Sequence, residues 1–212
     1  EARQKRRHLD PREALDLAVG VADEHGQVER QAGDVRERVA GVDGQRCEHG
    51  EDAVVVELAE RLVIGGVEQT AHFFAFDLPH SDASFVRAYP AAVAEAWVDG
   101  HIHAFAFFGA VPQSIVYDND RCLVAKILPD DTRKRAALFS GFLSHYLIRD
   151  RYGRPGKGND KGNVEGLVGY CRRNFMVPLP EFATWEAFNL WLEEQCRKRQ
   201  QDVLRGEGET IG

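Results

Sequence analysis

The first 72 residues of the chain contain no aromatic side chain. All 12 Phe, 5 Tyr and 3 Trp residues lie from Phe73 onward, which marks a boundary in composition. Residues 1–60 are mostly charged or small, and they carry 15 acids against 9 bases. Such a segment can bury little apolar area to offset its ordering entropy. We therefore expect residues 1–60 to be a disordered N-terminal segment, with residues 1 to about 55 packing little against the remainder.

Other absences exclude several classes of protein. The four cysteines are far apart and form no CxxC pair, as in a reduced cytoplasmic protein. No stretch approaches the roughly 20 apolar residues of a membrane span, and the N-terminus has no apolar core typical of a secretion signal. Glycine motifs of nucleotide-binding loops and the nucleophile elbow of hydrolases are missing. His101 and His103 lie on different faces of a helix and lack a third zinc ligand.

From residue 62 the pattern becomes regular and predicts a mixed α/β fold. Apolar and aromatic runs bounded by turn residues predict strands, and apolar residues at helical spacing predict helices. Thr184 stands where the N-cap of the last helix is expected. The expected strands are 62–64, 71–78, 83–89 and 113–120, and the expected helices are 90–109, 132–148, one after the glycine-rich loop that begins at 153, and 184–200.

Two acids stand where their backbone would be held firmly. Asp118, followed by Asn119, ends the strand "QSIVYDND", and Glu165 stands in the first turn of the helix after the loop "GRPGKGNDKGN". A helix N-terminus favours a negative charge, and carboxylates converging from different elements form the hard oxygen site that Mg²⁺ selects. A pair of such ions can activate a water or hydroxyl and stabilise the leaving oxygen of a phosphodiester. The alternative is that Asp118 is a turn residue and Glu165 a partner of the helix dipole.

Basic residues gather around these two acids, although the whole chain has a formal charge of -7. Between residues 121 and 173 there are 12 bases and 5 acids. Lys157 and Lys161 lie in the glycine-rich loop, where they suit sequence-independent contact with phosphates. Arg172, two helical turns after Glu165, and Arg173 could also meet a phosphate. Solvated surface charge is the alternative explanation for this cluster.

With these residues in place, the chain resembles a known family. "VPQSIVYDND" together with "GRPGKGNDKGNVEGLVGYCRRNF" resembles the catalytic core of IstA-type insertion-sequence transposases, which belong to the retroviral-integrase-like group. The resemblance runs from about residue 62 to the C-terminus. It implies a ribonuclease-H-like fold, a mixed five-stranded sheet flanked by helices. It also implies a catalytic core over 61–180 and a C-terminal helix with a truncated tail over 181–212.

The same resemblance implies a function. Such cores use three acids to hold two Mg²⁺ ions for DNA strand transfer, and by motif Asp118 would be the second acid and Glu165 the third. Asp118 and Glu165 would then be both catalytic residues and metal ligands, with their carboxyl groups roughly 4 to 8 Å apart. Lys157, Lys161, Arg172 and Arg173 would bind DNA. The implied partners are transposon ends and target DNA, further copies of the chain in a homo-oligomer, and a helper ATPase, with no membrane.

The first acid departs from the family pattern. The family carries it on the first strand, in a segment like Val-Asp-Phe-Gly-Glu shortly before the Gly-Gly turn, whereas this chain has "VVVELAERLVIGG". Glu57 is the nearest carboxylate and a doubtful substitute, because its longer side chain would shift a metal. Asp77 is expected to be structural. Residues 1–60 are expected to derive from a frameshifted reading. Two functions stay open: a metal-dependent transposase, and an inactive fragment that binds only DNA or partner subunits.

Overall fold

The structure, a computed structural model, describes residues 52–117, 124–127, 133–135, 137–152, 162–203 and 210–211. No helix among these residues is long and apolar enough to cross a membrane. The helices are α3 (Ala94–Phe108), α4 (Ala137–His145), α5 (Gly162–Phe175) and α6 (Trp185–Arg199). The strands are β1 (Asp52–Ile64), β2 (Val67–Leu78), β3 (Ala83–Tyr89), β4 (Ser114–Tyr117), β5 (Val124–Ile127), β6 (Arg133–Arg135), β7 (Arg149–Tyr152) and β8 (Glu181–Phe182).

The main sheet is mixed and has the order β3-β2-β1-β4-β7. β1, β2 and β3 form an antiparallel meander, and β4 and β7 add in parallel to the side of β1. Gly65 and Gly66 turn β1 into β2 with φ of 59° and 78°, a conformation that glycine adopts without strain. β8 pairs with the end of β1 as a sixth strand. The expected mixed α/β sheet is therefore confirmed, with one short strand more than expected.

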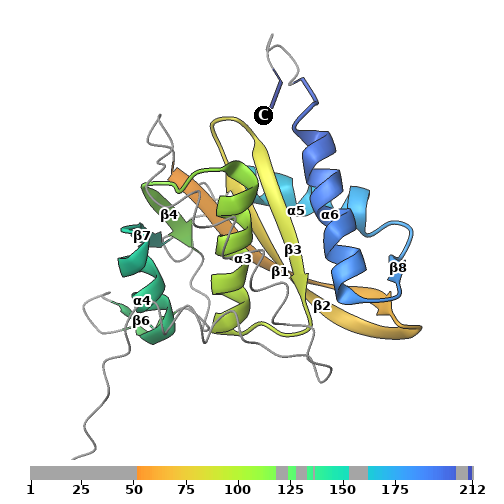
Figure 1. The fold of residues 1–212 in the computed structure, drawn as a ribbon, viewed down its shortest axis with the longest axis horizontal. Helices are drawn as coiled ribbons and strands as arrows, with labels where there is room; N and C mark the ends of the chain where they lie inside the picture. Colours follow the sequence, from red (N-terminus) through yellow and green to blue (C-terminus); the bar gives the residue numbers. More distant parts are fainter. Residues whose placement is uncertain are drawn as a thin grey trace, which may run out of the picture.

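Alternate side chains of β1 and β2 enter two separate cores, one on each face of the sheet. Ala53 and Val55 pack with residues of α3 and α4. Val56 and Leu58 pack instead with residues of α5 and α6. Figure 1 shows α3 and α4 on one side of β3 and α6 on the other. We call the side of the sheet that packs against α3 and α4 the α3 face, and the side that packs against α5 and α6 the α5 face. Successive residues of β1 point alternately to these two faces, because side chains alternate along a strand.

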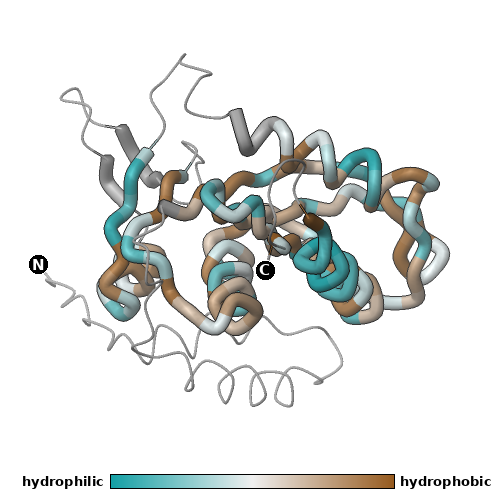
Figure 2. Tube along the Cα trace, turned by 90° about the horizontal axis from the view of Figure 1, so that it is seen from above, coloured by the Kyte–Doolittle hydropathy of each residue, from teal (hydrophilic) through white to brown (hydrophobic). Residues whose placement is uncertain are grey.

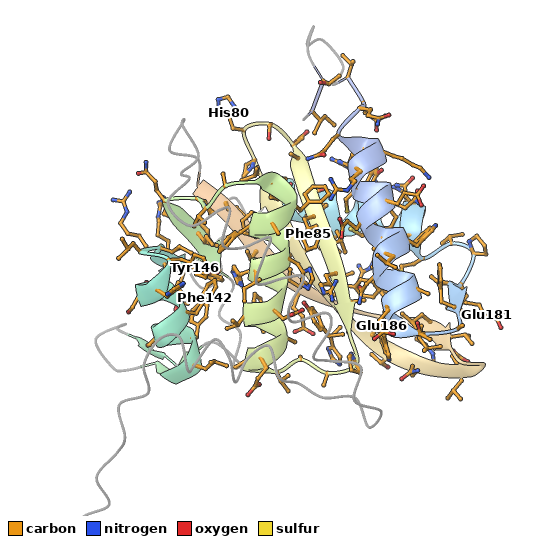
Figure 3. All side chains as sticks on the ribbon, viewed as in Figure 1. His80, Phe85, Phe142, Tyr146, Glu181 and Glu186 are labelled. Carbon is orange, nitrogen blue, oxygen red and sulfur yellow. The ribbon has the colours of Figure 1, made fainter. Side chains whose placement is uncertain are left out.

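Aromatic side chains fill the α3 face, as their concentration after Phe73 leads one to expect. Phe142 of α4 and Tyr146, the residue after this helix, point toward α3, where both contact the ring of Phe105 (Figure 3). Gly100 lets α3 approach β2 closely, because a Cβ at this position would lie 2.5 Å from a ring carbon of Phe74. The tight contact at Gly100 fixes the distance between α3 and the sheet.

α6 covers the outer strand β3 and takes the place of a further strand. The side chain of Asn189 is buried; its Oδ1 accepts from the N–H of Ala88 at 2.8 Å, and its Nδ2 donates to the C=O of Ala88 at 3.0 Å. Those backbone groups of β3 would otherwise be buried without partners. The predicted N-cap is confirmed, since Thr184 Oγ1 accepts from the N–H of Ala187.

Two sequence predictions of elements were wrong, and some short strands were not predicted. β1 begins at Asp52, and Ala53 and Val55 are fully buried, so residues 52–60 belong to the central sheet rather than to a disordered segment. Small and β-branched residues are enough to form a buried strand here, because the neighbouring strands supply the aromatic rings of the core. The helix expected over 132–148 is only α4, because Arg133–Arg135 pairs with β5. β7 was not expected, since "RDRY" has no apolar alternation. Residues 1–51 lie outside the described residues.

Candidate nucleic-acid and metal site

The strand and helix that carry the two predicted acids are formed as expected. β4 ends at Tyr117, directly before Asp118, and α5 begins at Gly162, so Glu165 stands in its first turn. The side chain of Glu165 and the whole of Asp118, Lys157 and Lys161 lie outside the described residues. The expected approach of the two carboxyl groups and the loop contacts to DNA therefore stay predictions.

The end of β4 is fixed by a buried histidine. The Nδ1–H of His101 donates to the carbonyl of Trp97 at 2.6 Å, which leaves Nε2 to accept from the hydroxyl of Tyr117 at 3.0 Å. Burial lowers the pKa of His101 to about 3, so the ring is neutral near pH 7. Rings of Phe74, Phe142 and others surround it. The residue before Asp118 thus has its backbone held by the sheet and its side chain held by the core.

The register between β1 and β4 identifies the β1 residues nearest to that end. The two strands run in parallel, with Val54 opposite Val116 and Val55 opposite Tyr117. Val55 and Tyr117 belong to the core of the α3 face. Val56, the next residue of β1, lies on the α5 face and is 7% exposed, packed with residues of α5 and α6. The residue of β1 that follows the Val55–Tyr117 pair is therefore apolar.

Glu57 lies on the wrong face of the sheet to share a metal with α5. Its Cα partner on β2 is Phe74, a member of the α3-face core, and its Oε1 lies 2.5 Å from Nδ1 of His72. The sheet therefore separates this carboxylate from the face that α5 covers. The side chain of Glu57 points to the α3 face because 57 is odd in a strand whose even residues face α5.

The two arginines expected to bind DNA lie in the last turn of α5, and one of them is paired. Arg172 Nε donates to Oε1 of Glu60, whose side chain is on the α5 face of β1. The side chain of Arg172 is still 57% exposed. Arg173 lies along the helix, where its Nη1 would be 3.1 Å from a Cβ added at Gly169. Sequence reasoning missed Glu60, because a pairing across 112 residues leaves no local signal.

No group of three His, Cys, Asp or Glu side chains that could hold a metal ion occurs in the part of the chain that the structure describes. Asp77 is the acid buried most deeply there, at 3% exposure. Its Cα partner is Val54, which places it on the α5 face. Burial, and then the charge of Asp82, raise the pKa of Asp77 to about 7, and Arg199 opposes the shift.

Comparison with known proteins gives relatives over about two thirds of the chain. A transposase of Aminobacter aminovorans is 35% identical over 148 residues, which are 69% of this chain and 29% of that protein. A transposase for insertion sequences IS1326/IS1353 of Pseudomonas aeruginosa is 32% identical over 134 residues, 63% of this chain and 26% of the relative. The chain is homologous to insertion-sequence transposases. This transposase homologue spans less than a third of the length of these two relatives. No protein-family model matches it.

Solved structures confirm the fold of the transposase homologue. The HTLV-2 integrase catalytic core domain in complex with magnesium, in its dimeric form, superposes with a TM-score of 0.53 at 12% identity, covering 76% of this chain and 93% of that one. A simian T-cell lymphotropic virus intasome in complex with the PP2A regulatory subunit B56 gamma gives a TM-score of 0.51 at 15% identity, covering 80% of this chain and 56% of that one. The ribonuclease-H-like fold expected from the sequence is thus confirmed.

Proposed function

We propose that this chain is the core segment of a transposase that acts on DNA in transposition, and that it binds DNA without joining it. Asp118 and Glu165 would be the second and third acids of a metal site for strand transfer. The homologous transposases and the integrase-like fold support the first part of this proposal. The deciding observation for the second part, binding without joining, is that the residue at position 56 is a buried valine.

Position 56 is where the first acid would have to stand. If the parallel register that pairs Val55 with Tyr117 continued by one residue, Val56 would lie beside position 118. Both positions would then be on the α5 face, toward the helix that carries Glu165. Valine offers no ligand to a cation, so two acids are left for a site that needs three. The chain therefore does not fit the two Mg²⁺ ions that the resemblance implies.

The test is to restore the acid. We expect the unmodified chain to bind duplex DNA and to join no labelled transposon ends in Mg²⁺ or Mn²⁺. Val56→Asp should gain Mg²⁺-dependent joining, and adding Asp118→Ala or Glu165→Ala to it should abolish that gain. Without metal, Val56→Asp should unfold at a lower temperature because it buries a carboxylate, and Mg²⁺ should restore part of the loss by binding the folded state.

Val54→Asp is the matched control for this experiment. It places the same side chain on the same face of β1, but opposite Val116 rather than beside position 118. We expect Val54→Asp to gain neither joining nor a Mg²⁺-dependent shift in melting temperature. Efficient joining by the unmodified chain, lost in Asp118→Ala and in Glu165→Ala, would refute the assignment of position 56 and favour the active transposase.

The partners follow from the same proposal. The DNA would be transposon ends and target, bound through Lys157, Lys161, Arg172 and Arg173. A homo-oligomer is consistent with the dimeric form of the integrase core and the intasome among the structures of similar fold. A helper ATPase and a cytoplasmic location rest on the family resemblance and the sequence. Sedimentation of the chain with and without DNA ends measures its oligomeric state directly.

A further inference from the structure

β7 forms the edge of the main sheet opposite to β3, in the described part of the chain, and it carries two exposed arginines. Arg149 is opposite Ser114 of β4, and Arg151 is opposite Val116. Residues two apart on a strand project to the same face, and their side chains start about 6.6 Å from each other. β7 is a hydrophilic stretch of the chain at the edge of the molecule, as the teal colouring in Figure 2 shows.

Both arginines belong to the α5 face. Val116, the partner of Arg151, is also the partner of Val54, which packs against the α5-face core. Tyr152 and Asp150 alternate with the arginines and belong to the opposite face, where Tyr152 packs against the α3-face core. The two guanidinium groups therefore lie on the same side of the sheet as α5, which carries Arg172 and Arg173.

A hollow accompanies this edge. It has a volume of about 600 Å³, opens to solvent, and is lined by Ser114, Ile148, Arg149, Asp150 and Arg151. Two of the five lining residues are cationic, one is acidic and one bears a hydroxyl, so the lining has a net positive charge. Guanidinium and hydroxyl groups bind phosphate oxygens in many proteins.

We propose that the β7 edge binds the phosphate backbone of DNA through Arg149 and Arg151. The site adds to the α5 arginines and lies on the same side of the sheet. A duplex that reaches α5 is thereby also held at the β7 edge. Positive side chains favour a polyanion here over a further β-strand, because charged residues on an edge strand oppose strand addition. The inference rests on the proposed DNA binding and extends it to a surface outside the predicted metal site.

The experiment measures the affinity for a random-sequence duplex against salt concentration. Each phosphate contact contributes about 0.9 to the slope of log K against log salt, so Arg149→Gln/Arg151→Gln should lower the slope by roughly 1 to 2. Arg61→Gln/Lys198→Gln removes the same charge from two exposed positions on other elements, β1 and α6, and should leave the slope nearly unchanged. Equal melting temperatures and circular dichroism spectra show that both double variants are folded.

The outcomes separate this inference from the proposed function. If the unmodified chain binds no duplex at about 50 mM salt, the proposed DNA binding itself fails. If it binds and the Arg149→Gln/Arg151→Gln slope equals that of the control, DNA binding stands and the β7 site is wrong. If sedimentation finds that the β7 variant alone changes from dimer to monomer while its DNA slope is unchanged, β7 is an interface between copies, which also overturns the inference.

Discussion

Asp77 is a buried carboxyl group whose protonation is coupled to folding. Because its pKa rises from 3.8 to about 7 in the folded state, the folded chain binds a proton there that the unfolded chain has released. Stability is therefore lost as pH rises from about 4 through 7, by on the order of 4 kcal/mol at most. We expect Asp77→Asn, which cannot ionise, to remove this loss.

Urea unfolding at several pH values checks the prediction for Asp77. The difference in free energy of unfolding between Asp77→Asn and the unmodified chain should grow in favour of the variant from pH 4 to pH 8. Comparison with the variant also cancels the opposite contribution of His101, whose lowered pKa makes stability fall on acidification from about 6.5 toward 3. A difference that stays constant with pH would mean that Arg199 keeps Asp77 ionised.

Arg172 is paired with Glu60, so Glu60 would compete with phosphate for its guanidinium if Arg172 binds DNA as proposed. Glu60→Gln removes this competition, so we expect tighter binding of duplex DNA at low salt, by at most about fivefold for an exposed ion pair. Glu68→Gln is the matched control, because Glu68 pairs with Arg61 on the β1–β2 hairpin and its loss changes the net charge equally. Equal gains in both variants would indicate overall charge, rather than release of Arg172, as the cause.

At the scale of elements, two helical glycines are expected to respond oppositely to substitution by alanine. In α3, Gly100→Ala drives a methyl group into the ring of Phe74, and overpacking of this kind costs about 1–3 kcal/mol. In α5, no atom of the described residues beyond the backbone of the helix itself lies within 4 Å of a Cβ added at Gly166, so Gly166→Ala should stabilise by about 0.5–1 kcal/mol through helix propensity. Thermal unfolding of both variants tests the close contact of α3 with β2; an unchanged or raised melting temperature for Gly100→Ala would contradict it.

The junction of α6 and β3 depends on Asn189. Asn189→Ala leaves the N–H and C=O of Ala88 without side-chain partners in a buried place, which should cost about 2–4 kcal/mol. Hydrogen exchange at the Ala88 amide should also become faster. Asn174→Ala serves as the control, because Asn174 is exposed and makes one hydrogen bond, to the carbonyl of Tyr170, so its loss should cost less than about 1 kcal/mol.

Elements with strong local signals were predicted from sequence, and those formed by pairing were not. Thr184 and the periodicity after it defined α6, and the glycine-rich loop before Glu165 located the start of α5. β7 exists because its backbone pairs with β4, a contact that "RDRY" does not encode locally. The same limit applies to the site: the motif around Glu165 was visible, whereas the pairing of Glu60 with Arg172 and the facing of Glu57 depend on register.

For the whole molecule, the two cores are expected to unfold together. β1 and β2 contribute alternate residues to both faces, so neither core can dissolve while the other keeps its strands. Trp97 reports on the α3 face, and Trp185 and Trp191 report on the α5 face. We expect Trp97→Phe and Trp185→Phe/Trp191→Phe to give fluorescence midpoints in urea that each coincide with the circular dichroism midpoint of the same variant. Separate midpoints for the two reporters would show independent units.

The side chain of Asn189 also blocks the addition of a strand at one edge of the sheet. Its two hydrogen bonds occupy the backbone of Ala88 on β3, so a further strand finds that place on β3 taken, whereas β7 is the other edge in the described part of the sheet. If two copies paired through β7, the outer edge of each sheet would be β3, where Asn189 occupies the backbone of Ala88. A third copy could then not add a strand to either edge. A fibre needs two open edges in every copy. One buried amide thus limits the stoichiometry of any sheet-to-sheet assembly to two.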